Sequence, residues 1–179
     1  MARLKKAANT DSSGVVILKE LKPRLERLQT MRAIYVHASG ATPEEDAQQR
    51  ILNWAKFKQL LDKPGLRLFG RNTYPTEKPE PHGYEYYLTL DKELEAYWDS
   101  VETKEVPGGL YATLRFTDLT RIGEAWKQLW EWIEKSGYTH AGLTKGEHGW
   151  VNGFEEHVNW REMKPPNEWI FDLWVKLKE

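Results

Sequence analysis

Two stretches of this chain repeat each other, and the repeat restricts the fold more than any other feature. A shift of 72 positions aligns them without a gap, so that Trp54 meets Trp126, Leu60 meets Trp132 and Gly65 meets Gly137. Downstream, a shift of 70 aligns Gly-Tyr-Glu at 83–85 with Gly-Phe-Glu at 153–155. We therefore predict two related halves, about 24–92 and 101–178, each ordered strand, helix, strand, strand.

Each half is predicted to contain one amphipathic helix. The first begins at Thr42, because proline and two glutamates follow it and complete a capping box. It is expected to end at Lys63-Pro64-Gly65. The second runs from about residue 119 or 120 to Lys135, before Gly137. Their apolar stripes are Ile51, Trp54, Phe57, Leu60 and Leu61 in the first helix, and Ile122, Trp126, Leu129, Trp130 and Ile133 in the second.

Alternating apolar and polar residues predict the strands. The predicted strands are 31–38, 66–71, 83–90, 101–106 and 110–116, with further candidates at 138–143, 153–160 and 168–178. Residues 14–30 leave two interpretations open: the run 15–18 suits a strand, whereas Leu21, Leu25 and Leu28 have helical spacing. Residues 1–13 have little to bury and are expected to be a disordered tail, which leaves 14–179 as one domain.

Neither half is large enough to cover its own sheet. We therefore expect an α+β fold in which one antiparallel sheet carries both helices on one face. Alternation places Phe154 on the helix side, together with Glu156. The opposite face is expected to form a cleft along the junction of the halves. The residues assigned to that face are Tyr35, His37, Glu85, Tyr87, Tyr111, Thr113, Arg115, Glu155 and His157.

Composition excludes several classes of function. Without cysteine there is no disulfide, thiol nucleophile or thiolate zinc site, and 26 basic residues nearly balance 27 acidic ones, so no strong field favours nucleic acid. No apolar run approaches the roughly 20 residues of a membrane span, and we expect a cytoplasmic protein. The five histidines lack metal-site spacing, and no phosphate-binding loop is present, so no metal or cofactor is expected. Nine tryptophans, however, suit a pocket for flat or cationic ligands as well as a core.

Six motifs in this order resemble the GyrI-like small-molecule-binding domain, which is also the effector-binding domain of multidrug-responsive transcription activators of the MerR and AraC types. The resemblance covers about residues 24–178. The motifs are Met31-Arg32-Ala33-Ile34-Tyr35-Val36, Ile51-x-x-Trp54-x-x-Phe57, Val106-Pro107-Gly108-Gly109-x-Tyr111-Ala112, Ile122-x-x-x-Trp126-x-x-Leu129, Ser136-Gly137-Tyr138 and Phe154-Glu155-x-His157.

The resemblance implies a pair of βαββ units and a central cleft that binds amphipathic, often cationic, aromatic compounds through a buried glutamate. Matched by motif, that glutamate is Glu155, and the family's strand tyrosine is Tyr111. His157 stands where the family has tyrosine, which is a departure from its pattern. The remaining ligand-binding candidates come from the predicted cleft face and the connector between the halves: Tyr35, His37, Tyr87, Glu85, Arg115 and Trp98.

Three functions remain open from the sequence. The first is a non-enzymatic protein that binds a cationic aromatic compound. The second is a hydrolase of strained-ring or xenobiotic compounds in the same cleft, with Glu155 as general base and Tyr111 or His157 as proton donor. The third, a gyrase inhibitor, ranks lowest because acidic and basic residues are interleaved. No helix-turn-helix precedes Arg24, so direct nucleic-acid binding is not expected, and a homodimer is left open.

Overall fold

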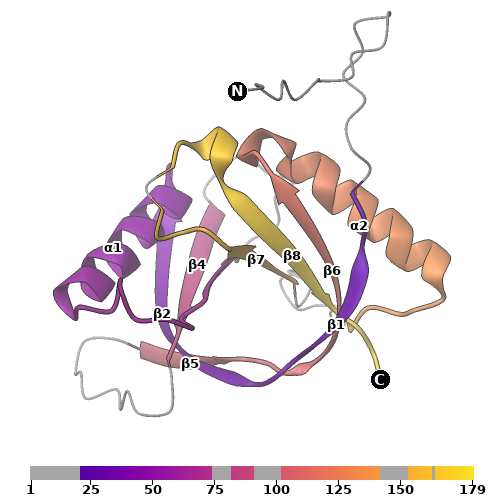
Figure 1. The fold of residues 1–179 in the computed structure, drawn as a ribbon, viewed down its shortest axis with the longest axis horizontal. Coiled ribbons are helices and arrows are strands. Elements are labelled where there is room, and N and C mark those ends of the chain that lie inside the picture. Colours follow the sequence, from indigo (N-terminus) through magenta and orange to yellow (C-terminus); the bar gives the residue numbers. More distant parts are fainter. Residues whose placement is uncertain (1–20, 74–81, 91–101, 142–152, 163) are drawn as a thin grey trace, which may run out of the picture.

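The computed structural model describes residues 21–73, 82–90, 102–141, 153–162 and 164–179. These residues form two halves with the same order of elements (Figure 1). The first half contributes β1 (Arg24–Leu28), β2 (Met31–Gly40), α1 (Pro43–Phe57), β3 (Leu68–Asn72) and β4 (His82–Thr89). The second half contributes β5 (Glu102–Val106), β6 (Gly109–Thr117), η1 (Leu119–Arg121), α2 (Ile122–Ser136), β7 (Gly153–His157), η2 (Pro166–Glu168) and β8 (Ile170–Lys176).

All the strands belong to one antiparallel sheet, in the order β1-β6-β8-β7-β3-β4-β2-β5. At its centre β3 pairs with β7, where Gly70 lies opposite Glu155. The outermost strands are exchanged between the halves, because β1 pairs with β6 and β5 pairs with β2. Exchanging the two halves gives the same strand order in reverse. The predicted α+β fold with a pseudo-twofold repeat is confirmed, with the axis at the β3–β7 pair.

The register of the repeat differs from the prediction. Strands β1 and β5 begin 78 residues apart, as do β2 and β6. The buried residues of the two helices keep the same spacing: Ala47 and Ala125, Ile51 and Leu129, Ala55 and Ile133. The alignment of Trp54 with Trp126 is therefore wrong. Both tryptophans are only partly buried beside these stripes, so matching them slips the register of the helices.

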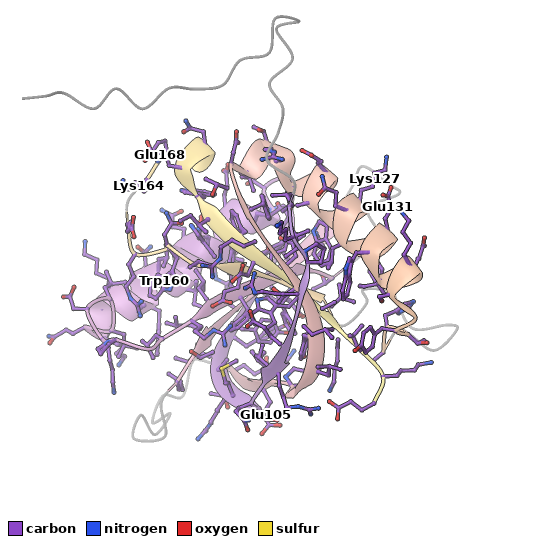
Figure 2. All side chains as sticks on the ribbon, turned by 45° about the vertical axis from the view of Figure 1, so that its right-hand side comes forward. Glu105, Lys127, Glu131, Trp160, Lys164 and Glu168 are labelled. Carbon is purple, nitrogen blue, oxygen red and sulfur yellow. The ribbon has the colours of Figure 1, made fainter. Side chains whose placement is uncertain are left out.

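Both helices cover the same, outer face of the curled sheet (Figure 1). Helix α1 packs on β2 and β4, and α2 packs on β6 and β8. Each helix has its own core: Ile51 packs with Leu88 on the first half, and Leu129 with Leu173 on the second. The other side of α2 is charged, with Lys127 and Glu131 (labelled in Figure 2) 3.9 Å apart. The two halves therefore pack as separate helix-on-sheet layers joined at β3 and β7.

The ends of the helices agree only partly with the prediction. Helix α1 begins at Pro43 as predicted, but the Thr42 side chain makes no capping hydrogen bond. It ends at Phe57, well before Lys63, because Gln59 adopts a left-handed backbone conformation with φ 58°. Helix α2 ends before Gly137, whose φ of 79° favours glycine. The strand β1 excludes the helical interpretation of Leu21, Leu25 and Leu28, whereas the predictions for 1–13 and 15–18 lie outside the described residues.

The inner face of the sheet is packed rather than hollow, so the predicted cleft on that face is wrong. Its aromatic side chains form a third core, in which the Phe69 and Phe154 ring centroids are 5.8 Å apart. The ring centroids of Tyr111 and Trp174 are 5.9 Å apart in the same core. The reason is the curl of the sheet, which turns side chains from distant strands toward one another.

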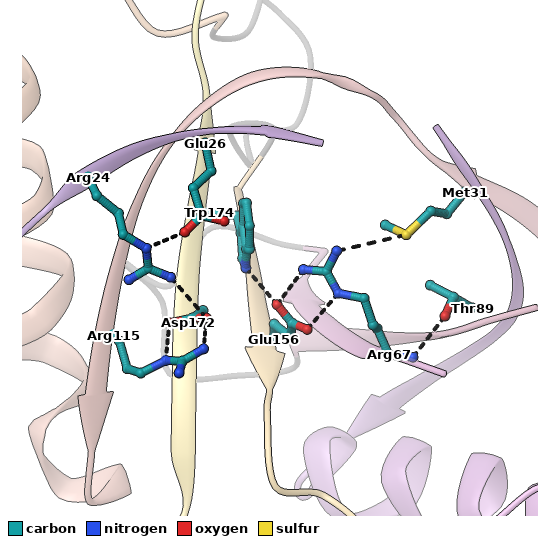
Figure 3. Close-up of polar contacts among 9 residues, drawn as sticks. All are labelled: Arg24, Glu26, Met31, Arg67, Thr89, Arg115, Glu156, Asp172 and Trp174. Carbon is teal, nitrogen blue, oxygen red and sulfur yellow. Dashed lines mark hydrogen bonds and ion pairs between the residues drawn. The ribbon is translucent and has the colours of Figure 1, made fainter. Parts of the chain in front are cut away.

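Ion pairs lie on the inner face beside Trp174 of this third core (Figure 3). The Arg67 guanidinium donates two hydrogen bonds to Glu156, at 2.7 and 2.6 Å, and the Trp174 Nε1 donates a third at 3.0 Å. Arg115 likewise donates two to Asp172, at 2.9 and 2.6 Å. Glu156 therefore points away from the helices, and the prediction that it faces them is wrong.

Candidate functional site

A cavity of about 780 Å³ lies between the first turns of α1 and α2, over the centre of the sheet. This volume is within the range of about 300 to 1,000 Å³ that small-molecule sites occupy. The first half lines the cavity with the start of α1 and with β3 and β4, and the second half with α2, β7 and the η2–β8 segment. The aromatic lining residues are Tyr84, Tyr86, Trp126, Trp130, Trp169 and Phe171.

Glu155 lies in the wall of this cavity and is 9 % exposed. The Tyr84 hydroxyl donates a hydrogen bond to its Oε2 at 2.6 Å, and the Trp126 Nε1 donates to its Oε1 at 2.9 Å. Burial raises the pKa of Glu155, because a charged carboxylate loses hydration, and Glu44 raises it further. The two donors act in the opposite direction by favouring the ionised form. The carboxylate is thus oriented by both halves of the molecule.

The cavity has acidic side chains at two places. Glu44 and Glu45 project from the first turn of α1, and Glu155 from β7. Among the described lining residues Arg71 is the only basic one, and its Nε donates to Glu85 on the inner face of the sheet, at 2.7 Å. Burial also raises the pKa of Tyr84 well above its usual value, so its hydroxyl keeps its proton. An apolar, aromatic cavity with a buried carboxylate in its wall suits a cationic group.

The structure separates the residues that were assigned to one cleft face. Glu155 and His157 face the helices, whereas Tyr35, Tyr87 and Tyr111 lie in or against the inner core, so their predicted grouping is wrong. The error comes from Phe154, because its apolar side chain suggested that it faces the helices. Because the inner face is also apolar, burial of Phe154 does not distinguish the two faces.

Glu85, Tyr35 and Tyr87 form a hydrogen-bonded group on the inner face. The Tyr35 hydroxyl donates to Glu85 at 2.8 Å and the Tyr87 hydroxyl donates to it at 2.6 Å. Burial raises the pKa of Glu85, but the Tyr87 and Arg71 donors outweigh this effect and its pKa is lowered. Glu85 is therefore a structural anion, and its ion-pair partner is Arg71.

Three other predicted site residues lie away from the cavity, and a fourth is outside the residues that the structure describes. Tyr111 donates from its hydroxyl to the Pro107 carbonyl at 2.7 Å, and Arg115 is held by Asp172. His37 lies 3.4 Å from the Thr73 hydroxyl, outside the cavity lining. Trp98 lies outside the described residues.

His157 lies behind the cavity wall. Its ring is 4.9 Å from that of Trp169 and 4.8 Å from that of Phe171, both of which line the cavity. Burial lowers the pKa of His157 to about 4. The imidazole is therefore neutral near pH 7 and supports the wall as an aromatic ring.

Tyr84, Tyr86 and Trp126 line the cavity beside Glu155, and none of them was among the predicted site residues. Tyr84 and Tyr86 occupy alternate positions of a predicted strand, and Trp126 is part of the apolar stripe of a predicted helix, so each pattern suits a core residue. The structure places them at the edge of their cores, where they also face the cavity. The excess of tryptophan was the one available signal, but it does not identify which ring is exposed to a ligand.

The described part of the chain contains neither a metal-binding group nor a membrane-spanning helix. No group of three or more histidine, aspartate or glutamate side chains is arranged to hold a metal ion among these residues. None of the helices described is long and apolar enough to cross a membrane.

A duplicated α+β domain with an aromatic cavity between its helices is the class that this geometry defines. The chain belongs to the GyrI-like family, since the family model for the GyrI-like small molecule binding domain matches residues 21–178. That match covers both halves and every strand described above. No curated protein matches the chain in sequence.

Solved structures share the fold at low sequence identity. The C-terminal domain of EcmrR aligns with a TM-score of 0.60 and 12 % identity over 89 % of this chain and 98 % of that domain. In the EcmrR–DNA complex, where the TM-score is 0.62 and the identity 12 %, the alignment covers 89 % of this chain and 58 % of the longer EcmrR chain. SAV2435 bound to tetraphenylphosphonium gives 0.55 and 13 % over 88 % of this chain and 94 % of SAV2435. A hydrolase from Listeria innocua gives 0.56 and 10 % over 90 % of this chain and 94 % of the hydrolase.

Proposed function

We propose that this protein binds an amphipathic aromatic cation in the cavity between α1 and α2, with Glu155 as its anionic anchor. The observation that carries the proposal is a buried carboxylate, held by Tyr84 and Trp126, in the wall of an aromatic cavity. The solved complex of SAV2435 with tetraphenylphosphonium supports the ligand class by analogy.

The energetics favour a cation over a neutral ligand. Glu155 has given up most of its hydration, which raises its pKa, and a bound cation replaces that hydration in a medium of low dielectric. The rings of Trp126, Trp130 and Trp169 add apolar contact area and cation–π attraction. A large, weakly hydrated organic cation suits this combination, because it loses little hydration when it enters.

We expect Glu155→Gln to weaken binding of rhodamine 6G, a fluorescent aromatic cation, by about 1.5 to 3 kcal/mol, or roughly 10- to 150-fold. Glutamine keeps the size of the side chain and removes the charge. Fluorescence anisotropy titrations of both proteins at pH 7 and low salt measure the difference. The matched control is Glu134→Gln, which makes the same charge change at an exposed position of α2 and should leave affinity unchanged.

The same titration across pH adds a second readout. Binding requires the ionised carboxylate, so it is complete above the pKa of Glu155 and is lost as pH falls through it. Because burial raises that pKa, the loss should begin at a higher pH than for an ordinary glutamate. Equal affinity of the wild type and Glu155→Gln at every pH contradicts the proposal.

Hydrolysis of a strained-ring compound in the same cavity is a second candidate function. A carboxylate whose pKa is raised by burial suits a general base, which favours this candidate. The predicted proton donors do not: Tyr111 faces the inner core, and His157, with a pKa of about 4, is a neutral imidazole at pH 7 and so a very weak acid. Glu155 would therefore both take the proton from water and return it to the leaving atom.

Mass spectrometry of strained-ring electrophiles incubated with the protein tests this candidate. We expect a product heavier than the substrate by one water molecule, formed by the wild type and not by Glu155→Gln. Unchanged substrate after prolonged incubation, or equal turnover by the two proteins, rejects the enzymatic function and leaves the binding function untouched.

A further inference from the structure

The Tyr84 ring lies directly over the backbone of Gly70. Gly70 is the middle residue of β3, where it pairs with Tyr86 on β4 and with Glu155 on β7. Tyr84 is 4 % exposed, and its ring lies 5.0 Å from that of Tyr86. From this position the Tyr84 hydroxyl reaches across β3 to Glu155 Oε2 at 2.6 Å. A hydrogen bond between β4 and β7 thus passes over the single strand that separates them.

A side chain at Gly70 would occupy the space of this ring. A Cβ built on Gly70 lies 2.7 Å from Tyr84 Cε1 and 2.8 Å from Tyr84 Cζ, with the Tyr84 hydroxyl oxygen nearest of all. These separations are shorter than carbon–carbon contact of about 3.5 to 4.0 Å. Because Tyr84 is buried against Tyr86, the ring has to move into the cavity and away from Glu155 to make room.

The pseudo-twofold axis makes Gly70 the equivalent of Glu155 in the other half. Phe69 on β3 and Phe154 on β7 are equivalent inner-core residues whose rings contact each other. The next residue along each strand is Gly70 in the first half and Glu155 in the second. One half therefore supplies a carboxylate at this position, and the other supplies bare backbone that the tyrosine ring covers.

We propose that Gly70 is a positioning residue of the ligand site: it has no Cβ, so the Tyr84 ring lies flat on β3 and its hydroxyl orients the Glu155 carboxylate for a cationic ligand. This inference rests on the binding function proposed above. A carboxylate oxygen accepts more than one hydrogen bond, so Oε2 bonded to Tyr84 and Oε1 bonded to Trp126 both remain able to contact a cation.

We expect Gly70→Ala to bind rhodamine 6G on the order of tenfold more weakly than the wild type, because it breaks one charge-assisted hydrogen bond that orients the anchor. The same substitution should raise the pKa of Glu155 in the ligand-free protein, measured by NMR titration of the side-chain carboxyl carbon. The groups that face Glu155 from neighbouring elements are Tyr84 and Tyr86 on β4, Trp126 on α2 and Glu44 on α1, and only the Tyr84 contact changes.

Gly108→Ala is the matched control. It adds the same atom at another crowded glycine, in the turn between β5 and β6, where the Cβ would lie 2.7 Å from the backbone nitrogen of Thr30. Gly108→Ala should lower stability without changing the pKa of Glu155 or the affinity for rhodamine 6G. Equal changes in both variants would show a general loss of structure and overturn the proposal.

If Gly70→Ala does not fold, the same substitution in a Tyr84→Val protein still tests the role of Gly70. Tyr84→Val removes the ring that the new Cβ would meet, so Gly70→Ala/Tyr84→Val should fold as Tyr84→Val does, with the same Glu155 pKa and the same affinity. A difference between these two proteins overturns the role of Gly70. If wild type fails to bind the dye, the binding function fails, and the Glu155 pKa still decides whether Gly70 positions Tyr84.

Discussion

Glu156→Gln is expected to lower the free energy of unfolding by about 3 kcal/mol. Glu156 is 7 % exposed and accepts two hydrogen bonds from Arg67 and one from Trp174. Glutamine keeps an acceptor for Trp174 but leaves Arg67 without its anion. The Arg67 guanidinium lies 4.7 Å from the centre of the Phe69 ring and 5.1 Å from that of Trp174, so little water can replace that anion. The Arg67 side chain is 31 % exposed, which keeps the expected loss at the lower end of the range for a broken buried pair.

Urea denaturation followed by tryptophan fluorescence measures this loss. Glu26→Gln is the control, because Glu26 pairs with Arg24 on the same face while its side chain is 38 % exposed. That control should lose less than about 1 kcal/mol, as exposed ion pairs do. Adding Arg67→Met to Glu156→Gln removes the unpaired charge and should restore most of the stability. Unfolding midpoints that coincide for wild type and Glu156→Gln contradict the inner-face assignment of Glu156.

Glu155 and Glu156 are adjacent in sequence and differ in role, because alternation along β7 turns them to opposite faces. Glu156 should matter for stability and, in the folded protein, little for binding. Glu155 should matter for binding. Measuring both properties on both variants separates the two roles without reference to any other residue.

The sequence was sufficient to predict the fold where one face of an element is apolar and the other polar. Strand β6 follows this rule, since Leu114 and Phe116 face α2 while Arg115 faces the other side. Helix α2 follows it as well: it ends at Ser136, one residue after the predicted end, and it begins at Ile122, after the 3-10 turn η1 that occupies the predicted start. The repeat itself was detectable because each half must bury one helix on its own strands.

The sequence was not sufficient where both faces of a strand are buried. All the residues of β7 are buried, so alternation has no solvent side from which to fix its phase. Phe154 was therefore assigned to the wrong face, and Glu155 and His157 with it. The location of the cavity followed the same error, because it depends on which face the carboxylate occupies.

The sequence did not predict the residues around Glu155 for a different reason. Tyr84 and Trp126 occupy apolar positions of their strand and helix, and only the tertiary fold brings their polar atoms to the carboxylate. The hydrogen bonds of Glu155 with Tyr84 and Trp126 join residues that are 71 and 29 positions apart in sequence. Their pairing is a property of the sheet order, which no local pattern encodes.

The comparison of tetraphenylphosphonium with tetraphenylborate tests the proposed cation site most directly. The two ions have nearly the same size and shape and carry opposite charges, so apolar contacts with the cavity cancel in the comparison. Attraction to Glu155 is replaced by repulsion, a change of roughly 3 to 6 kcal/mol, or about 10²- to 10⁴-fold in affinity. Isothermal titration calorimetry of the wild-type protein with each ion should give binding of the phosphonium and none of the borate at matched concentration. Equal binding of the two ions, or tighter binding of the borate, contradicts an anionic anchor in this cavity.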